Sequence, residues 1–96
     1  MNPLLHGGNM YIILAYDVNI DRINVVRKIL RKYLNWVQNS VFEGPITEAN
    51  YERLVNEIKG CINEDEDSIL IYKLRDKWFV KRDIIGLEKS TISNII

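Results

Sequence analysis

An uninterrupted run of strand-forming residues, Tyr11 to Tyr16, ends directly on Asp17. β-Branched and aromatic residues without polar alternation are typical of a strand that is buried on both faces, near the centre of a sheet. A carboxylate at the end of such a strand is held by rigid backbone but remains within reach of solvent and ligands. Asp17 is therefore a candidate ligand for a metal or phosphate group, although a role in the following turn or as a helix cap explains its position equally well.

Two amphipathic helices are predicted on either side of a short segment with a period of two. Apolar residues recur at helical spacing from Asp21 to Leu34 and again from Thr47 to Ile62. Between these helices, the alternating pattern over residues 36–43 fits either one bent strand or a very short hairpin. The pair Gly44-Pro45 then ends the segment.

Two further strands are predicted over residues 68–74 and 78–85. The resulting order of elements, βαββαβ plus an extra C-terminal strand, predicts an α+β fold of the ferredoxin-like, split βαβ type. A chain of 96 residues has room for one such domain. We expect this domain to span residues 10–87, with a flexible leader over 1–9 and a C-terminal tail over 88–96.

Composition argues against several classes of protein. The single cysteine, Cys61, has no partner in the chain for a disulfide, and the only histidine, His6, has no companions for a zinc site. Residues 1–9 lack the basic start and the long apolar core of a secretion signal or a membrane span. We therefore expect a cytoplasmic protein that does not interact with membranes.

Charge is unevenly distributed although the net charge is zero. Five basic residues and no acid fall within 22–32, five basic residues and one acid fall within 73–82, and eight acids fall within 43–67. This pattern predicts a molecule with one basic side, which a phosphate backbone would contact; a solvated helix face is the alternative. The candidate nucleic-acid-binding residues are Arg22, Arg27, Lys28, Arg31, Lys32, Arg75 and Lys77.

Three short motifs resemble one known family. Tyr16-Asp17 closes the first predicted strand, Gln38 to Gly44 has the form Gln-x-Ser-Val-Phe-Glu-Gly, and Ile84 to Gly86 reads Ile-Ile-Gly. In this order, and with a basic helix between the first two, they resemble the CRISPR-associated protein 2 family, the small partner in spacer acquisition. The resemblance covers residues 10–87.

The resemblance implies a homodimer whose two sheets pack face to face and bring the two copies of Asp17 together. Each Asp17 would then be a catalytic residue and a ligand of one Mg²⁺ or Mn²⁺ shared across the dimer. Sharing explains the site, because a single carboxylate supplies too few ligands for such an ion. Tyr16 and Ser40 are implied as further catalytic residues. Gln38 and Phe42 are expected at the dimer interface, with the core as the alternative position for Phe42.

The resemblance also implies two roles. Members of the family have been described as metal-dependent endonucleases acting on single-stranded RNA or double-stranded DNA, and as non-catalytic bridges between CRISPR integrase dimers and the DNA to be inserted. The implied partners are thus a second copy, integrase dimers, and DNA or RNA. The same architecture also serves nucleic-acid-binding modules and regulatory domains, and a toxin-like ribonuclease acting alone is a further alternative.

Overall fold

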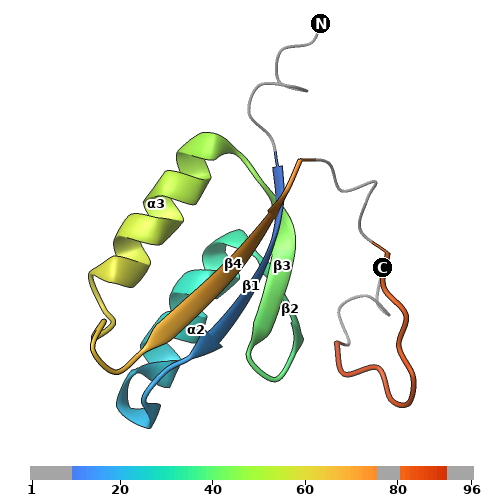
Figure 1. Cartoon of the computed structure of the whole chain (residues 1–96), viewed down its shortest axis with the longest axis horizontal. Coiled ribbons are helices and arrows are strands. Elements are labelled where there is room, and N and C mark those ends of the chain that lie inside the picture. The colour runs from blue at the N-terminus through green and yellow to red at the C-terminus, as the bar shows by residue number, and fades with distance from the viewer. Residues whose placement is uncertain (1–9, 76–80, 91–96) are drawn as a thin grey trace, which may run out of the picture.

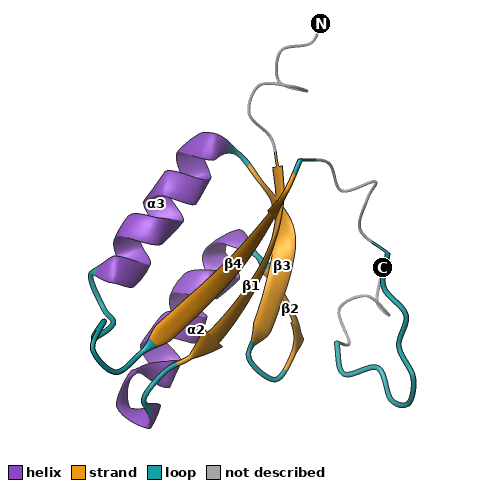
Figure 2. Cartoon of the chain, viewed as in Figure 1, coloured by secondary structure: helices purple, strands orange, loops and turns teal. Residues whose placement is uncertain are grey.

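A four-stranded antiparallel sheet with two helices on one face makes up the fold (Figures 1 and 2). This computed structural model describes residues 10–75 and 81–90. In chain order the elements are β1 (Met10–Asp17), α2 (Ile20–Tyr33), β2 (Asn35–Gln38), β3 (Val41–Ile46), α3 (Glu48–Lys59) and β4 (Ser68–Leu74). The strand order β2-β3-β1-β4 is that of a split βαβ arrangement, so the predicted ferredoxin-like α+β fold is confirmed.

The apolar run at the start of the chain forms the central strand β1, as predicted. β1 pairs with β3 on one side and with β4 on the other, both antiparallel. Ile12, Leu14 and Tyr16 face the helices and are buried, whereas the residues that alternate with them are only half-buried. The second face of β1 is thus apolar without being fully covered by the described residues.

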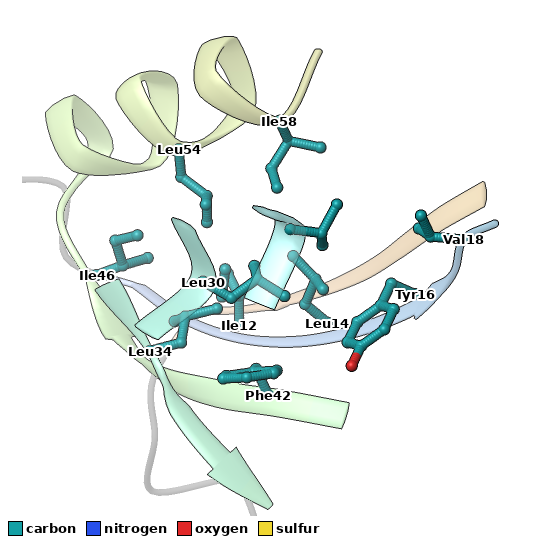
Figure 3. Packing of buried hydrophobic residues seen from close by; sticks show 11 residues of the cluster. Ile12, Leu14, Tyr16, Val18, Leu30, Leu34, Phe42, Ile46, Leu54 and Ile58 are labelled. Atoms are coloured by element: carbon teal, nitrogen blue, oxygen red, sulfur yellow. The ribbon is translucent and has the colours of Figure 1, made fainter. Parts of the chain in front are cut away.

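The hydrophobic core lies between the sheet and the two helices (Figure 3). Leu30 of α2, Leu54 of α3 and Phe42 of β3 are completely buried there. The helices contribute residues at helical spacing, and the strands contribute every second residue. The buried core residues are Ile12, Leu14, Tyr16, Val18, Val26, Leu30, Leu34, Phe42, Ile46, Leu54 and Ile58.

Each helix begins with a side-chain cap. The Asn19 side chain accepts a hydrogen bond from the backbone of Asp21 at the start of α2, and Thr47 Oγ1 accepts one from the backbone of Asn50 at 3.1 Å in α3. Such caps satisfy backbone N–H groups that have no partner within the helix. Among the described residues, no helix is long and apolar enough to cross a membrane.

The segment between the helices is a hairpin rather than one bent strand. β2 and β3 are joined by Asn39 and Ser40, and Asn39 adopts a positive φ of 45°, which asparagine tolerates better than most residues. The pairing changes register between Trp36 and Gln38, so Val37 is an extra residue in β2. This bulge interrupts the period-two pattern of the sequence.

The prediction of a strand over 78–85 is wrong for its described part. Residues 81–85 form no strand, and residues 78–80 lie outside the described residues. A strand needs a neighbour for its backbone hydrogen bonds, and 81–85 pair with neither edge of the sheet. The predicted leader over 1–9 also lies outside the described residues, so that boundary stays a prediction.

Candidate functional site

Asp17 is the last residue of β1 and its side chain is exposed. Because Tyr16 faces the helices, the next residue along the strand faces the opposite side of the sheet. In the ladder with β4, Asp17 lies across from Ser68. No described residue makes an ion pair or a side-chain hydrogen bond with Asp17. The carboxylate is therefore held at a fixed place and is free to bind a ligand.

Tyr16 and Ser40 lie beside each other, but Tyr16 points away from Asp17. The Tyr16 backbone N–H donates a 3.0 Å hydrogen bond to the carbonyl oxygen of Ser40, which brings the hairpin turn to the end of β1. Tyr16 is only 8% exposed, and its ring packs near Phe42, with the ring centroids 6.3 Å apart (Figure 3). Tyr16 thus lies in the core, on the helix side of the sheet.

The two residues expected at the dimer interface differ in position. Gln38 is exposed at the end of β2, where a second copy could contact it. Phe42 is 0% exposed and points into the core of its own protomer. The assignment of Phe42 to an interface is corrected on this ground, because its neighbour in the ladder, Leu14, also faces the helices. The residues that face outward on β3 are the ones that alternate with Phe42.

The side of the sheet opposite the helices, here called the open face, presents apolar side chains. Register places the side chains of β1, β3 and β4 that alternate with the core residues on this face. Leu70 is 51% exposed and Tyr72 is 57% exposed. The open face consists of Tyr11, Ile13, Ala15, Val41, Glu43, Pro45, Leu70, Tyr72 and Leu74, with Asp17 and Ser68 at one end.

One acid lies on the open face among these apolar residues. Glu43 is largely buried and pairs with Arg82 from the segment 81–90. Burial, together with the neighbouring Glu43 carboxylate, raises the pKa of Tyr11 to about 12. The Arg82 contact attaches the segment 81–90 to β3, although this segment forms no strand.

A buried carboxylate fixes the loop that follows Asp17. Asp67 Oδ1 accepts a hydrogen bond from the Asn19 backbone at 2.8 Å, and Asp67 Oδ2 accepts one from Asn63 N at 2.9 Å. Arg22 donates to both oxygens, from Nε at 2.6 Å and from Nη2 at 3.1 Å. Arg22 Nη2 also donates to Glu66 Oε1 at 2.8 Å. We call Asn19, Arg22, Asn63, Glu66 and Asp67 the loop clamp.

The loop clamp was missed by the sequence analysis. The side chain of Asp67 is 0% exposed, whereas the acidic run at 64–67 had the composition of a solvated turn. Hydrogen bonds from the Arg22 guanidinium hold the pKa of Asp67 well below its usual range. Arg22, a candidate nucleic-acid-binding residue, is thus engaged in ion pairs with Asp67 and Glu66. No local pattern links residues 45 positions apart.

The other candidate nucleic-acid-binding residues differ in exposure and in whether they form ion pairs. Lys28 and Arg31 are exposed on α2 and form no ion pair with a described residue. Lys32 pairs with Glu57 of α3, and that hydrogen bond raises the pKa of Lys32. The basic charge of α2 is therefore partly neutralised by Glu57 of α3. Lys28 and Arg31 are the exposed cations of α2 that no described acid neutralises.

Three candidates remain. Arg27 is half-buried, and its Nε has no acceptor among the described residues. Arg75 is exposed after β4. Lys77 lies outside the described residues. A neighbouring cation, Lys73, lies over the ring of Tyr51 at 4.4 Å from its centroid, so it packs against α3.

The described part of one protomer does not supply a complete metal site. It contains no group of three or more His, Cys, Asp or Glu side chains that could hold a metal ion. Asp17 provides one accessible carboxylate of the type that Mg²⁺ and Mn²⁺ bind, whereas these ions take several oxygen ligands. Asp17 would therefore fit a divalent cation if a second copy contributed its own Asp17 and water molecules completed the coordination.

Comparison with known proteins identifies the family. The model of the family "CRISPR associated protein Cas2" matches residues 10–82. Proteins named CRISPR-associated endoribonuclease Cas2 are 52% identical in Methanocaldococcus jannaschii, over 97% of this chain and 82% of that protein, and 53% identical in Thermococcus kodakarensis, over 91% of this chain and all of that protein.

Solved structures agree with this match. A crystal structure of Cas2 superposes with a TM-score of 0.80 and 43% identity, covering 86% of this chain and 93% of that one. Cas2 of Streptococcus pyogenes superposes with a TM-score of 0.71 and 32% identity, covering 80% of this chain and all of that one. With its sheet order, its exposed strand-end aspartate and these matches, the chain belongs to the CRISPR-associated protein Cas2 family.

Proposed function

We propose that the protein is a homodimeric endoribonuclease of a CRISPR system, in which the two copies of Asp17 hold one Mg²⁺ or Mn²⁺. The observation that carries this proposal is the position of Asp17 at the rigid end of the central strand, where its exposed carboxylate has no partner among the described residues. The relatives in Methanocaldococcus jannaschii and Thermococcus kodakarensis carry the name endoribonuclease. Asp17 supplies the kind of ligand that such chemistry requires.

The open face supports a dimer formed through the sheets. Leu70 and Tyr72 expose about half of their surface next to the half-buried apolar residues of β1. Contiguous apolar patches of this kind mark interaction sites on proteins that otherwise present polar surfaces. A second copy that packs on this face about a two-fold axis would cover it. Asp17 lies at the end of the same face, so a two-fold axis that passes near this end would bring the two carboxylates together.

The residues of the chain would have distinct tasks in cleavage. A bound divalent cation polarises a phosphate and lowers the pKa of a water molecule. Asp17 would hold and orient this ion from the end of β1. Ser40 lies at the same end of the sheet through its hydrogen bond with the Tyr16 backbone, and its hydroxyl would orient the substrate. Tyr16 would act indirectly, because its ring anchors the end of β1 in the core.

We propose as a second function a part in spacer acquisition, with CRISPR integrase dimers and DNA as partners. The observation that favours it is the pair of exposed cations Lys28 and Arg31 on α2. α2 covers the helix side of the sheet, whereas Asp17 belongs to the opposite side. Contacts with phosphates through α2 would therefore leave the candidate metal site unused. This role would need the dimer but not cleavage.

A cleavage assay separates the two functions. End-labelled single-stranded RNA and duplex DNA would be incubated with the protein in Mg²⁺ and in chelator, and the same would be done with Asp17→Asn and with Asp65→Asn. Asp65 is an exposed aspartate in the loop before β4, so it controls for the loss of one surface charge. Light scattering would first verify that each variant is a dimer.

We expect cleavage that requires Mg²⁺, is lost in Asp17→Asn and is retained in Asp65→Asn. Absence of cleavage by the wild type, or equal cleavage by Asp17→Asn, would leave the role in spacer acquisition as the better account. Cleavage that persists in chelator would also contradict a metal-dependent reaction.

A further inference from the structure

The loop clamp connects three segments through one side chain. Asp67 receives hydrogen bonds from Asn19 in the β1–α2 connection, from Arg22 in the first turn of α2 and from Asn63 in the α3–β4 loop. These donors are separated from one another by up to 44 positions in the sequence but meet at one carboxylate. Both oxygens of Asp67 are occupied, and the side chain has no exposed surface.

The clamp adjoins Asp17 from two directions. Asn19 follows Asp17 by two residues, and the residue between them, Val18, is buried in the core. Asp67 immediately precedes Ser68, which lies opposite Asp17 in the β1–β4 ladder. The Asp67 side chain thus connects the segment that follows Asp17 with the segment that precedes Ser68. The backbone next to Asp17 and next to Ser68 is therefore held by the same carboxylate.

Asn19 is the most strongly restrained residue of the connection. Its backbone N–H donates to Asp67, its side chain accepts from Asp21 N at 2.9 Å, and its carbonyl oxygen accepts from Arg22 N at 2.8 Å. Without Asp67, the first of these restraints disappears, because the Asn19 backbone N–H loses its acceptor. The chain after Asp17 would then have more freedom to change its course.

Resting on the proposed function, we propose that Asp67, acting with Arg22, is a positioning residue that sets the orientation of Asp17 for the divalent cation shared by the dimer. The clamp does not touch the ion. Hydrogen-bond partners behind a metal ligand restrict its orientation, and their loss commonly weakens metal binding by about 10- to 100-fold. In a site with one carboxylate per protomer, an error in orientation would be repeated on both sides of the ion.

The alternative is that the clamp only stabilises the fold. Both roles predict a less stable Asp67→Asn variant, because the asparagine amide presents a donor to groups that are themselves donors. The roles differ in what happens to metal binding by the folded protein. Positioning predicts weaker binding in a fully folded sample, and simple stabilisation predicts unchanged binding.

The experiment is a titration of the full chain with Mn²⁺ alone. Binding is measured by calorimetry or electron paramagnetic resonance at a temperature where every sample is folded. The samples are the wild type, Asp17→Asn, Asp67→Asn and Ile46→Ala. Ile46 is buried at the other end of the sheet, opposite Met10, so Ile46→Ala controls for loss of stability far from Asp17. Amide hydrogen exchange at Asn19 would report on the connection directly.

We expect Asp67→Asn to bind Mn²⁺ at least about tenfold more weakly than the wild type, with faster exchange at the Asn19 amide. Ile46→Ala should bind Mn²⁺ as the wild type does. If Asp67→Asn does not fold, Arg22→Lys gives the same test, because it keeps the charge but loses the two-point contact with Asp67.

Each outcome is decisive. If Asp17→Asn abolishes binding and Asp67→Asn binds as the wild type, the positioning role is overturned and the proposed metal site stands. Equal weakening by Asp67→Asn and Ile46→Ala would also overturn positioning, because a general loss of stability would explain both. If the wild type does not bind Mn²⁺, or Asp17→Asn binds it unchanged, the proposed metal site fails and the positioning role fails with it.

Discussion

Replacing Phe42 by alanine should destabilise each protomer without acting directly on dimerisation. Phe42 is completely buried between the sheet and the helices, beside Leu14 in the ladder and near the Tyr16 ring. Removal of a buried phenylalanine typically costs about 3–5 kcal/mol, because apolar contacts are lost and a cavity remains. For a domain of this size, the lower figure corresponds to a fall in melting temperature of at least about 12 °C.

Urea unfolding followed by circular dichroism would measure this loss. Because the stability of a dimer depends on protein concentration, the titrations should be repeated at several concentrations. The dissociation constant of the folded dimer would be measured separately by analytical ultracentrifugation. Leu70→Glu is the matched variant, since Leu70 is half-exposed on the open face. It should weaken the dimer while changing the free energy of unfolding of the monomer by only about 0.5 kcal/mol.

The opposite pattern would refute the reasoning. A Phe42→Ala protein that unfolds at the urea concentration of the wild type but no longer dimerises would place Phe42 at the interface, as the sequence suggested. If Phe42→Ala does not fold at all, Phe42→Leu keeps most of the side-chain volume. It should show a smaller loss of stability with the same unchanged dimer.

Two further predictions concern charge. Replacing Lys28 and Arg31 by glutamine should weaken duplex DNA binding and reduce the slope of log affinity against log salt by about 0.9 for each lost phosphate contact. Lys59→Gln on α3 is the control and should leave the affinity and the slope unchanged. Fluorescence anisotropy across a salt series measures both quantities, and a wild-type affinity that does not change with salt contradicts the prediction. Arg22 depresses the pKa of Asp67 in the folded state, so the stabilisation by Asp67 is fully present above about pH 4 and is lost as pH falls below it. Thermal unfolding should therefore show a smaller loss of stability on acidification in Asp67→Asn than in the wild type, and an equal loss would contradict this assignment.

Most of the secondary structure followed from local patterns. The apolar run ending on Asp17, the two helical periodicities and the motif from Gln38 to Gly44 correctly predicted a central strand, two helices and the family. Each of these signals depends on residues that are close in sequence, where spacing alone decides which side chains share a face. The helix predicted from Asp21 to Leu34 extends from Ile20 to Tyr33.

The predictions for individual side chains were less reliable, because strand alternation and distant partners decide them. Tyr16 and Asp17 are neighbours in the sequence and were predicted to act together, but they face opposite sides of the sheet. Phe42 belongs to the core for the same geometric reason. The strand predicted over 78–85 had suitable composition, but its described part has no hydrogen-bonding neighbour in the sheet.

The sequence by itself determined the central strand with the aspartate that ends it, the two helices and the family. Only the tertiary structure decided the partners of the charged residues. Arg22 and Lys32 belong to one basic segment of the sequence, residues 22–32. Arg22 nevertheless pairs with Asp67 and Lys32 with Glu57, because folding brings α2 beside α3 and beside the loop before β4. Ion pairs between residues far apart in the chain depend on how the helices and strands pack together, and hydrophobic periodicity says nothing about which charges will meet.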